Sequence, residues 1–317
     1  MKKILLLLLM FNFFLFSCDS GSGDNSAPDT DIEQPDQPDQ PDDNKNTDRE
    51  NYLTPNVDSE GKIIVNYTPK EYVATVEEGQ HMMSVRIPKN YYTSASTLKG
   101  DDLREELQEI ISTGAIKLEY TSSSSYDVWD MCEAGDQNPA DERQVWQIYT
   151  ETGRAKNDHS AGVSDEWNRE HVWAKSHGDF GTSPGAGTDG HHLRASYSRE
   201  NSTRGNKNFG DVNGPRTSNT QFYEPPLSAK GDVARMIFYM AVRYDFKVDN
   251  SGVIDKEARM GKLDDLLKWN ELDPVDPYEI RRNNIIYGFQ KNRNPFIDHP
   301  ELVKYVFGDK KDATWKE

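Results

Sequence analysis

Residues 168–176 read NREHVWAKS and residues 189–211 read DGHHLRASYSRENSTRGNKNFGD, and these stretches decide the fold. Each contains a short run of aromatic and branched side chains, EWNREHVWA (166–174) and GHHLRASY (190–197), which predicts a strand. The segment between them, GDFGTSPGAGTDG, holds five glycines and one proline, a composition typical of a loop. A helix is expected to begin at Ser198. The order strand, loop, strand, helix predicts a compact ββα unit.

The rest of the chain reads mainly as helix. In residues 97–114, apolar side chains recur at helical spacing, acidic residues stand in the first turns and a glycine stands at the end. The most apolar segment, residues 230–246, predicts a helix that is buried on most sides. Further helices are expected over 255–272, 275–292 and 299–308. The sequence therefore predicts an α+β fold, in which a mainly helical scaffold carries the ββα unit.

The N-terminus carries an export pattern. Residues 1–17 combine two lysines with an apolar run that is too short for a comfortable membrane span, as in a signal peptide. The next residues, LFSC (15–18), resemble the lipobox of bacterial lipoproteins, which implies a lipid anchor on Cys18. The alternative is an ordinary signal peptide followed by an incidental cysteine. Cys132 is the second of two cysteines, so an acylated Cys18 would leave no internal disulfide.

Residues 18–52 are predicted to be a disordered acidic tether, because they are rich in Pro, Asp and Gln and repeat the triplet Gln-Pro-Asp. Together with the anchor, the tether implies an exported outer-membrane or cell-surface lipoprotein, facing the periplasm or the exterior. Residues 53–89 predict a small extension with strands in KIIVNY and HMMSVRIP. The body is expected to span residues 90–308, and residues 309–317 to form a tail.

Net charge argues against a nucleic-acid partner, whereas the distribution of charge favours one. The formal charge is −17, and residues 61–317 carry 33 basic against 41 acidic side chains. Between residues 166 and 210, however, six basic side chains stand against five acidic ones, and four of the seven histidines lie there. The predicted ββα unit is therefore a basic-to-neutral zone in an acidic protein.

The side chains of this unit suit a divalent cation beside a base. A hard divalent cation prefers oxygen ligands. The unit offers such oxygens in the carboxylates of Glu170 and Asp189 and the side-chain carbonyls of Asn201 and Asn206. A histidine held next to the ion by a strand suits the removal of a proton from water, because its ordinary pKa lies near neutrality. Neighbouring arginines suit a phosphate group.

NREHVWAKS and DGHHLRASYSRENSTRGNKNFGD resemble the active-site signature of the endonuclease I family, secreted and periplasmic bacterial nucleases of the His-Me finger (ββα-metal) class. Further resemblance lies in YYTSASTLKGDDLREELQEII (91–111), EPPLSAKGDVARMIFYMAVRY (224–244) and RRNNIIYGFQKNRNPFIDHPE (281–301). These segments stand in the order that the family has, and they span roughly residues 90–308.

The resemblance assigns roles to named positions. It makes His171 the general base that deprotonates the attacking water, and it makes Glu170 and Asn201 the ligands of a divalent metal ion. The implied cofactor is Mg²⁺, with Mn²⁺ or Ca²⁺ as alternatives. A cation bound by so few protein groups keeps positions open for a phosphate oxygen and the leaving 3′ oxygen.

Other polar residues of the unit have less definite roles. Three arginines are candidates for substrate-phosphate contacts, namely Arg169, Arg194 and Arg204. His191 and His192 are neighbours on one strand, so their side chains face opposite ways and at most one can face a metal ion. Both are expected to support the site.

The resemblance implies a largely sequence-nonspecific endonuclease that hydrolyses DNA, with RNA as a further substrate, and leaves 5′-phosphates. The active form is expected to be a monomer. Two alternatives stay open. A zinc-dependent hydrolase would use His171, His191 and His192 as ligands. A non-catalytic surface lipoprotein would bind a polysaccharide or a host partner, and would leave the motifs of residues 168–210 unexplained.

Overall fold

The computed structural model describes residues 62–65, 81–84 and 88–317. The predicted signal peptide, the anchor at Cys18 and the tether over 18–52 lie outside these residues. Of the predicted extension, strand β1 (Lys62–Val65) pairs antiparallel with β2 (His81–Ser84). Within the described ranges, no helix combines the length and apolarity that a membrane crossing requires.

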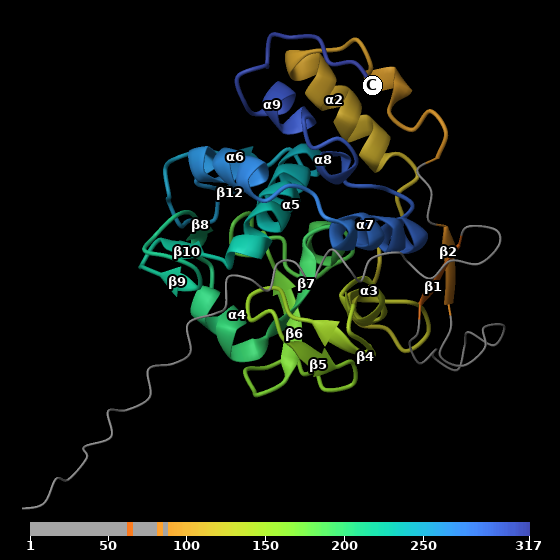
Figure 1. Cartoon of the computed structure of the whole chain (residues 1–317), viewed down its shortest axis with the longest axis vertical. Coiled ribbons are helices and arrows are strands. Elements are labelled where there is room, and N and C mark those ends of the chain that lie inside the picture. Colours follow the sequence, from red (N-terminus) through yellow and green to blue (C-terminus); the bar gives the residue numbers. More distant parts are fainter. Residues whose placement is uncertain (1–61, 66–80, 85–87) are drawn as a thin grey trace, which may run out of the picture. The chain divides into compact units, whose positions relative to one another are not determined.

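Helix α5 (Lys230–Arg243) is the centre of one hydrophobic core. Every residue from Lys230 to Val242 is buried, as the apolar run predicts. The helix packs against α2 (Gly100–Ser112), α6 (Leu263–Leu272) and α8 (Pro295–Asp298), and α9 (Leu302–Val306) packs on α2, α6 and α8 (Figure 1). The surrounding elements explain why even its polar side chains Asp232 and Arg235 are buried, each in an ion pair.

A second hydrophobic core joins helices to the central strands. Helix α3 (Val128–Gly135) packs against α7 (Pro277–Gln290) and strand β7 (Leu193–Tyr197), and strand β6 (Trp167–His171) contributes Trp167 to this core. Asp127 caps α3 by accepting from the backbone of Trp129 and Asp130, and the Asp130 carboxylate accepts from Asp127 N in return. This cap starts a helix that the sequence pattern did not predict.

Strands β6 and β7 pair antiparallel, with Glu170 opposite Arg194 and His171 opposite Leu193. Helix α4 (Ser198–Arg204) follows β7 directly and packs on both strands (Figure 1). The loop between the strands contains the 3₁₀ turn η3 (Ala186–Thr188). A Cβ atom on Gly187 would lie 2.2 Å from the carbonyl oxygen of Gly181, so this close approach requires glycine. The predicted order strand, loop, strand, helix is confirmed.

The remaining regular structure consists of short elements. One sheet contains β3 (Gln137–Asn138), β4 (Asp141–Trp146) and β5 (Gly153–Ala155), and another contains β8 (Asn208–Phe209), β10 (Phe222–Glu224) and β9 (Thr217–Ser218). Strands β11 (Lys247–Val248) and β12 (Arg259–Met260) pair in parallel, and the turns η2 (Thr93–Ala95) and η4 (Leu227–Ala229) complete the set. Helices and small sheets together confirm the α+β class.

The predicted helix over 255–272 is wrong in its first half. Only α6 (Leu263–Leu272) is helical, because the preceding segment forms β12 beside β11. At Gly261 a Cβ atom would lie 1.9 Å from the carbonyl oxygen of Asp249, and the Gly261 N–H donates to Asn208. These contacts outside the segment hold the chain extended where its own pattern favours helix. The helix predicted over 299–308 is likewise shorter, Leu302–Val306.

The predicted C-terminal tail belongs to the folded body. Trp315 is buried in the core around α5, and its backbone donates to Leu98 and accepts from Thr97. Its indole N–H donates to Glu301. The predicted boundary at residue 308 is therefore too early, because packing of one aromatic side chain continues the core beyond it.

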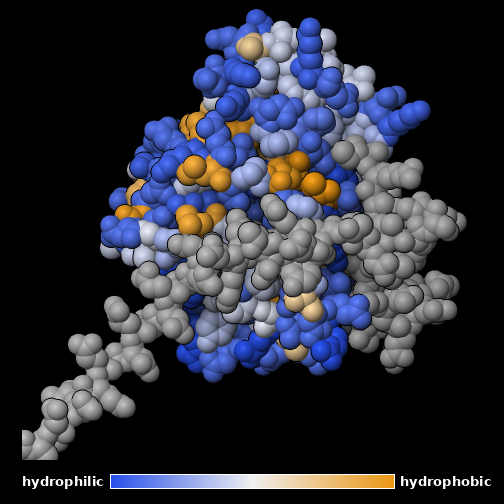
Figure 2. Space-filling view, in the orientation of Figure 1, coloured by the Kyte–Doolittle hydropathy of each residue, from blue (hydrophilic) through white to orange (hydrophobic). Residues whose placement is uncertain are grey.

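Figure 2 shows a face that is largely hydrophilic and is interrupted by small hydrophobic patches. Large apolar side chains that are exposed come from separate elements and loops, for example Val163, Leu227 and Leu272. Scattered apolar residues of this kind are normal on a folded protein. This face therefore offers mainly polar groups to a binding partner.

Candidate active site

A cleft of about 350 Å³ lies beside β6 and α4. Strand β6 contributes four consecutive residues, 168–171, and α4 contributes Asn201. The other lining residues are Tyr120, Trp129, Ser160, Ala161, Ala174, Lys175, Ser176, Gly205 and Asn206. The structure thus brings Glu170, His171 and Asn201 to one cleft, although Asn201 is separated from the others by a long loop.

His171 is oriented by a backbone carbonyl. The side chain is 7% exposed, and its Nε2 lies 3.0 Å from the carbonyl oxygen of Gly187. Because a carbonyl oxygen only accepts, Nε2 carries the proton, and Nδ1 is left with a lone pair. Burial, reinforced by His192, lowers the pKa of His171 well below its usual 6.5. The imidazole is therefore neutral near pH 7, with Nδ1 unprotonated.

Glu170 is held by two donors on one oxygen. Its Oε1 accepts from Tyr149 Oη at 2.6 Å and from Arg204 Nη1 at 2.8 Å. Burial raises the pKa of the Glu170 carboxyl, and the charge of Arg204 and the hydrogen bond from Tyr149 oppose that rise. Among the described residues, no side chain donates to Oε2. One oxygen is therefore fixed by the protein, and the other has no side-chain partner.

Asn201 is oriented by a second amide. Its Nδ2 donates to Asn168 Oδ1 at 2.8 Å, and Asn168 Nδ2 donates to Ser198 Oγ at 3.2 Å. This chain fixes which end of each amide is the donor. The carbonyl oxygen of Asn201 is left as an acceptor without a donor in the described part of the chain.

Arg169 lies against two aromatic rings. Its Cζ is 3.4 Å from the ring centroid of Tyr120 and 3.7 Å from that of Trp129. Its Nη1 donates to the carbonyl oxygen of Tyr120 and, at 3.1 Å, to Thr121 Oγ1. Burial lowers the pKa of Arg169, which nonetheless remains a cation. Of the three arginines predicted to bind substrate phosphate, Arg169 is the one that lines the cleft.

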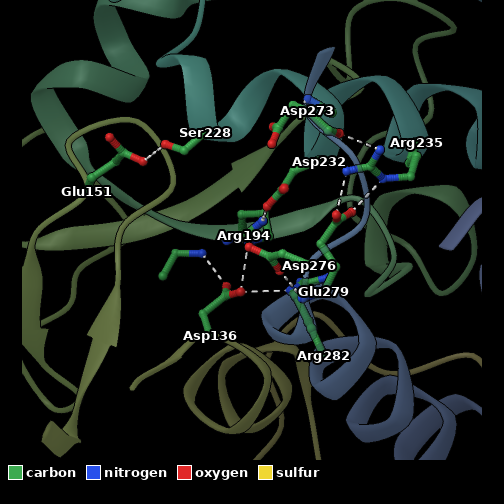
Figure 3. Close-up of polar contacts among 12 residues, drawn as sticks. Asp136, Glu151, Arg194, Ser228, Asp232, Arg235, Asp273, Asp276, Glu279 and Arg282 are labelled. Carbon is green, nitrogen blue, oxygen red and sulfur yellow. Dashed lines mark hydrogen bonds and ion pairs between the residues drawn. The ribbon is translucent and has the colours of Figure 1, made fainter. Parts of the chain in front are cut away.

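The structure corrects the prediction of a phosphate contact for Arg194. This guanidinium is fully buried between Asp136, 2.8 Å from its Nε, and Asp232, 3.0 Å from its Nη1 (Figure 3). Asp136 also binds Arg282 in the same network. The three-way pairing fixes β7 against α3, α5 and α7, so Arg194 acts within the fold.

The same correction applies to Arg204, which is also fully buried. Besides Glu170, its guanidinium donates to the carbonyl oxygens of His171 at 2.7 Å and Val172 at 2.6 Å. Arg204 therefore ties α4 to the end of β6. Because the protein already binds both of its Nη groups, Arg204 supports the cleft and has no Nη group left for a substrate phosphate.

The prediction that His191 and His192 lie on a strand is wrong: they stand in the turn directly before β7, and their side chains have different partners. His192 Nε2 donates to Ala186 O at 2.7 Å, and its ring lies 5.6 Å from that of His171. His191 Nε2 donates to Asn292 O at 3.1 Å. Neither lines the cleft. Among the described residues, no three His, Cys, Asp or Glu side chains are grouped so that they could hold a metal ion, so His171, His191 and His192 do not form the ligand set that the zinc alternative requires.

Four contact residues were missed in the sequence. Asn168 stands two positions before Glu170 in the motif, and the strand alternation could have placed both on one face. Tyr149, Tyr120 and Trp129 come from segments outside the motif, where no local pattern points to the cleft. Trp129 lies on α3, Tyr120 precedes that helix and Tyr149 follows β4, so tertiary packing and not spacing along the chain brings them to the site.

A comparison with known protein families shows to which family this chain belongs. The sequence model described as Endonuclease I matches residues 99–301. The chain belongs to the endonuclease I family. Among its relatives, this endonuclease I protein is 47% identical to an extracellular ribonuclease of Bacillus amyloliquefaciens over 233 residues, covering 69% of this chain and 78% of that protein.

Two further relatives bear on the comparison. An extracellular ribonuclease of Bacillus subtilis (strain 168) is 45% identical over 231 residues, covering 68% of this chain and 78% of that protein. An Endonuclease-1 of Buchnera aphidicola subsp. Baizongia pistaciae is 34% identical over 74 residues, covering 23% of this chain and 26% of that protein. This endonuclease I protein is accordingly a nucleic-acid-hydrolysing enzyme, which sets aside the non-catalytic alternative.

Proposed function

We propose that this endonuclease I protein cleaves internal phosphodiester bonds of RNA and DNA, with His171 as the general base. The observation that carries the proposal is the Nε2–H donated to Gly187, since it leaves the Nδ1 lone pair for a water molecule. The lowered pKa keeps this nitrogen unprotonated near neutral pH. The neutral tautomer needed by a base is thus set before substrate arrives.

The donor set of the cleft fits a divalent cation. Endonuclease I enzymes generally depend on such an ion. Glu170 and Asn201 line the same cleft, and each has one oxygen that no side chain of the described residues occupies. Mg²⁺ suits one or two protein oxygens plus water and phosphate, and Mn²⁺ or Ca²⁺ accepts the same donors. We therefore assign Glu170 and Asn201 as the residues that would hold the ion.

Each residue has one role in the proposed reaction. Nδ1 of His171 takes a proton from water as the oxygen attacks phosphorus, and the bond to the 3′ oxygen breaks. The leaving 3′ oxygen takes a proton from solvent to become a hydroxyl group, and the other product carries a 5′-phosphate. When bound, the cation supplies positive charge for the phosphate and the departing oxygen. Tyr149 and Arg204 hold Glu170 in place, and Asn168 orients Asn201.

The substrate range follows from the relatives and from the cleft. The two Bacillus relatives are named as ribonucleases and the Buchnera relative as an endonuclease, so we include RNA beside DNA. Phosphate contacts carry no sequence information. Because the contacts proposed for this cleft are to phosphate groups, we expect cleavage with little sequence preference.

The test is cleavage of a supercoiled plasmid and of a structured RNA, each with Mg²⁺ and with a chelator. His171→Ala should lower the rate about 10²- to 10⁴-fold, because a general base contributes that much. His299→Ala is the matched control, since this half-buried histidine does not line the cleft. A His171→Ala protein that cut either substrate at the wild-type rate would contradict the proposal.

We also propose export of the enzyme and anchoring through Cys18. The Bacillus relatives are named as extracellular, which supports export, and LFSC supports the anchor. A single acyl chain gives only weak membrane binding, so stable anchoring requires more than one. Labelled fatty acid should be incorporated into the wild-type protein and not into Cys18→Ser. Equal labelling of both proteins, or none in either, would exclude the anchor.

A further inference from the structure

Arg169 differs from Arg204, the buried arginine that holds Glu170, because it forms no ion pair with a carboxylate of the described residues. Arg204 pairs with Glu170, and Arg235 pairs with Glu279. Arg169 is 7% exposed, yet no carboxylate of the described residues lies within ion-pair distance of it. Asp127 favours the cation from a distance, but a buried guanidinium without a contact ion pair is still unfavourable. Its place in the wall of the active cleft indicates that a ligand supplies the missing anion.

The position of this guanidinium is fixed. Tyr120 and Trp129 place their rings within 4 Å of Cζ, and Nη1 is bound to Tyr120 O and Thr121 Oγ1. Stacking on aromatic rings suits the flat guanidinium group and not an ammonium group. One edge of Arg169 is therefore attached to the protein, and the plane of the group is set by the rings.

The opposite edge, which carries Nε and Nη2, is unoccupied. Nε is buried without a hydrogen-bond partner, and Nη2 donates to no described residue. Elsewhere in this protein, the same edge of Arg293 grips both oxygens of Asp298, with distances of 2.7 and 2.6 Å. Two parallel N–H groups match two oxygens of a phosphate equally well.

Strand geometry places this edge relative to the catalytic residue. Arg169 and His171 are two residues apart on β6, so they share a face and are separated by about 6.7 Å along the strand. The ring of Tyr120 lies against both, 5.7 Å from the ring of His171. A spacing of this order separates successive phosphates on one nucleic-acid strand.

We propose that the Nε–Nη2 edge of Arg169 binds the phosphate next to the one that is cleaved. This inference rests on the proposed function and adds a second phosphate site to it. By holding the neighbouring phosphate, Arg169 sets which phosphate lies opposite His171. The ligand is a phosphodiester group, which RNA and DNA share.

The test is binding without cleavage. A His171→Ala protein in chelator is titrated with a labelled single-stranded oligonucleotide, as DNA and as RNA, over a range of salt concentrations. Adding Arg169→Met should weaken binding about 10- to 100-fold, the effect expected for a charge-assisted bidentate contact. The slope of log K against log salt should fall by about 0.7, because one phosphate contact is lost. A loss with DNA alone or RNA alone would assign the site to that nucleic acid.

A matched control removes the same charge elsewhere. Arg143→Met deletes an exposed arginine outside the cleft, and it should change neither the affinity nor the salt slope by these amounts. Should Arg169→Met not fold, Arg169→Lys carries the test: it keeps the charge and lacks the flat bidentate edge, so binding should still weaken about tenfold. Wild-type affinity and slope in these variants would overturn the inference.

The outcome is separate from that of the proposed function. If the wild-type enzyme cuts and Arg169→Met leaves both the KM for substrate and the salt slope unchanged, the second phosphate site is wrong and the proposed function stands. If the wild-type protein cuts neither nucleic acid with Mg²⁺ but its binding depends on Arg169, the proposed function fails and the phosphate site stands.

Discussion

At the scale of single residues, the hydroxyl group of Tyr149 links the packed interior to the proposed metal site. It donates to Glu170 Oε1 at 2.6 Å, and it opposes the rise in pKa that burial causes in this carboxyl. In Tyr149→Phe, Glu170 loses a donor and binds a cation less well. We expect the Mg²⁺ concentration for half-maximal activity to rise about tenfold, with little change in kcat at saturating Mg²⁺. Calorimetry with Mn²⁺ should show the same loss of affinity.

The matched control for this prediction is Tyr92→Phe. Tyr92 is also fully buried, and its hydroxyl group donates to Asp298 at 2.7 Å, away from the cleft. If both variants lose stability but only Tyr149→Phe loses affinity for the cation, the hydroxyl acts through Glu170. An unchanged Mg²⁺ requirement in Tyr149→Phe would show that Arg204 alone suffices to hold the carboxylate.

The same scale shows which site residues the sequence could predict. Glu170 and His171 are adjacent, and Asn201 stands in a recognisable motif, so local patterns were enough to select three residues that line one cleft, and their roles stay predictions. Arg194 and Arg204 looked like phosphate contacts because their partners, Asp136 and Glu170, cannot be recognised from spacing along the chain. Tertiary packing decides whether an arginine binds a substrate or pairs with a buried carboxylate.

At the scale of elements, the prediction succeeded where local signals were strong. The glycine-rich loop between β6 and β7 separates two strands, and α5 contains the apolar run 236–242. It failed where an element depends on distant contacts. Helix α3 has only eight residues and relies on the cap formed by Asp127, and β12 is extended because it pairs with β11. Short elements of this kind are set by their neighbours more than by propensity.

At the scale of the whole molecule, two buried histidines make stability depend on pH. Burial lowers the pKa of His191 and of His192 to about 4, and Asp189 only partly opposes the effect. The positive charges of Arg282 and Arg293 lower the pKa of His191 further, and those of Arg204 and Arg282 lower the pKa of His192 further. In the unfolded chain a histidine titrates near 6.5. Below about pH 6.5 the unfolded state therefore binds more protons, and the free energy of unfolding falls until about pH 4.

His191→Gln isolates one of these groups. Glutamine does not titrate, and its amide can still donate to the carbonyl oxygen of Asn292. Between pH 4 and 6.5 the slope of unfolding free energy against pH, measured by urea denaturation, should fall by up to about 1.4 kcal/mol per pH unit. The control is His299→Gln. A hydrogen bond to Glu301 raises the pKa of His299, so its stabilisation is present below about pH 6.5 and is lost as pH rises through the folded pKa. His299→Gln should therefore change the slope of unfolding free energy against pH above pH 6.5, and with the opposite sign. If His191→Gln leaves the slope between pH 4 and 6.5 unaltered, protons enter this core without unfolding it.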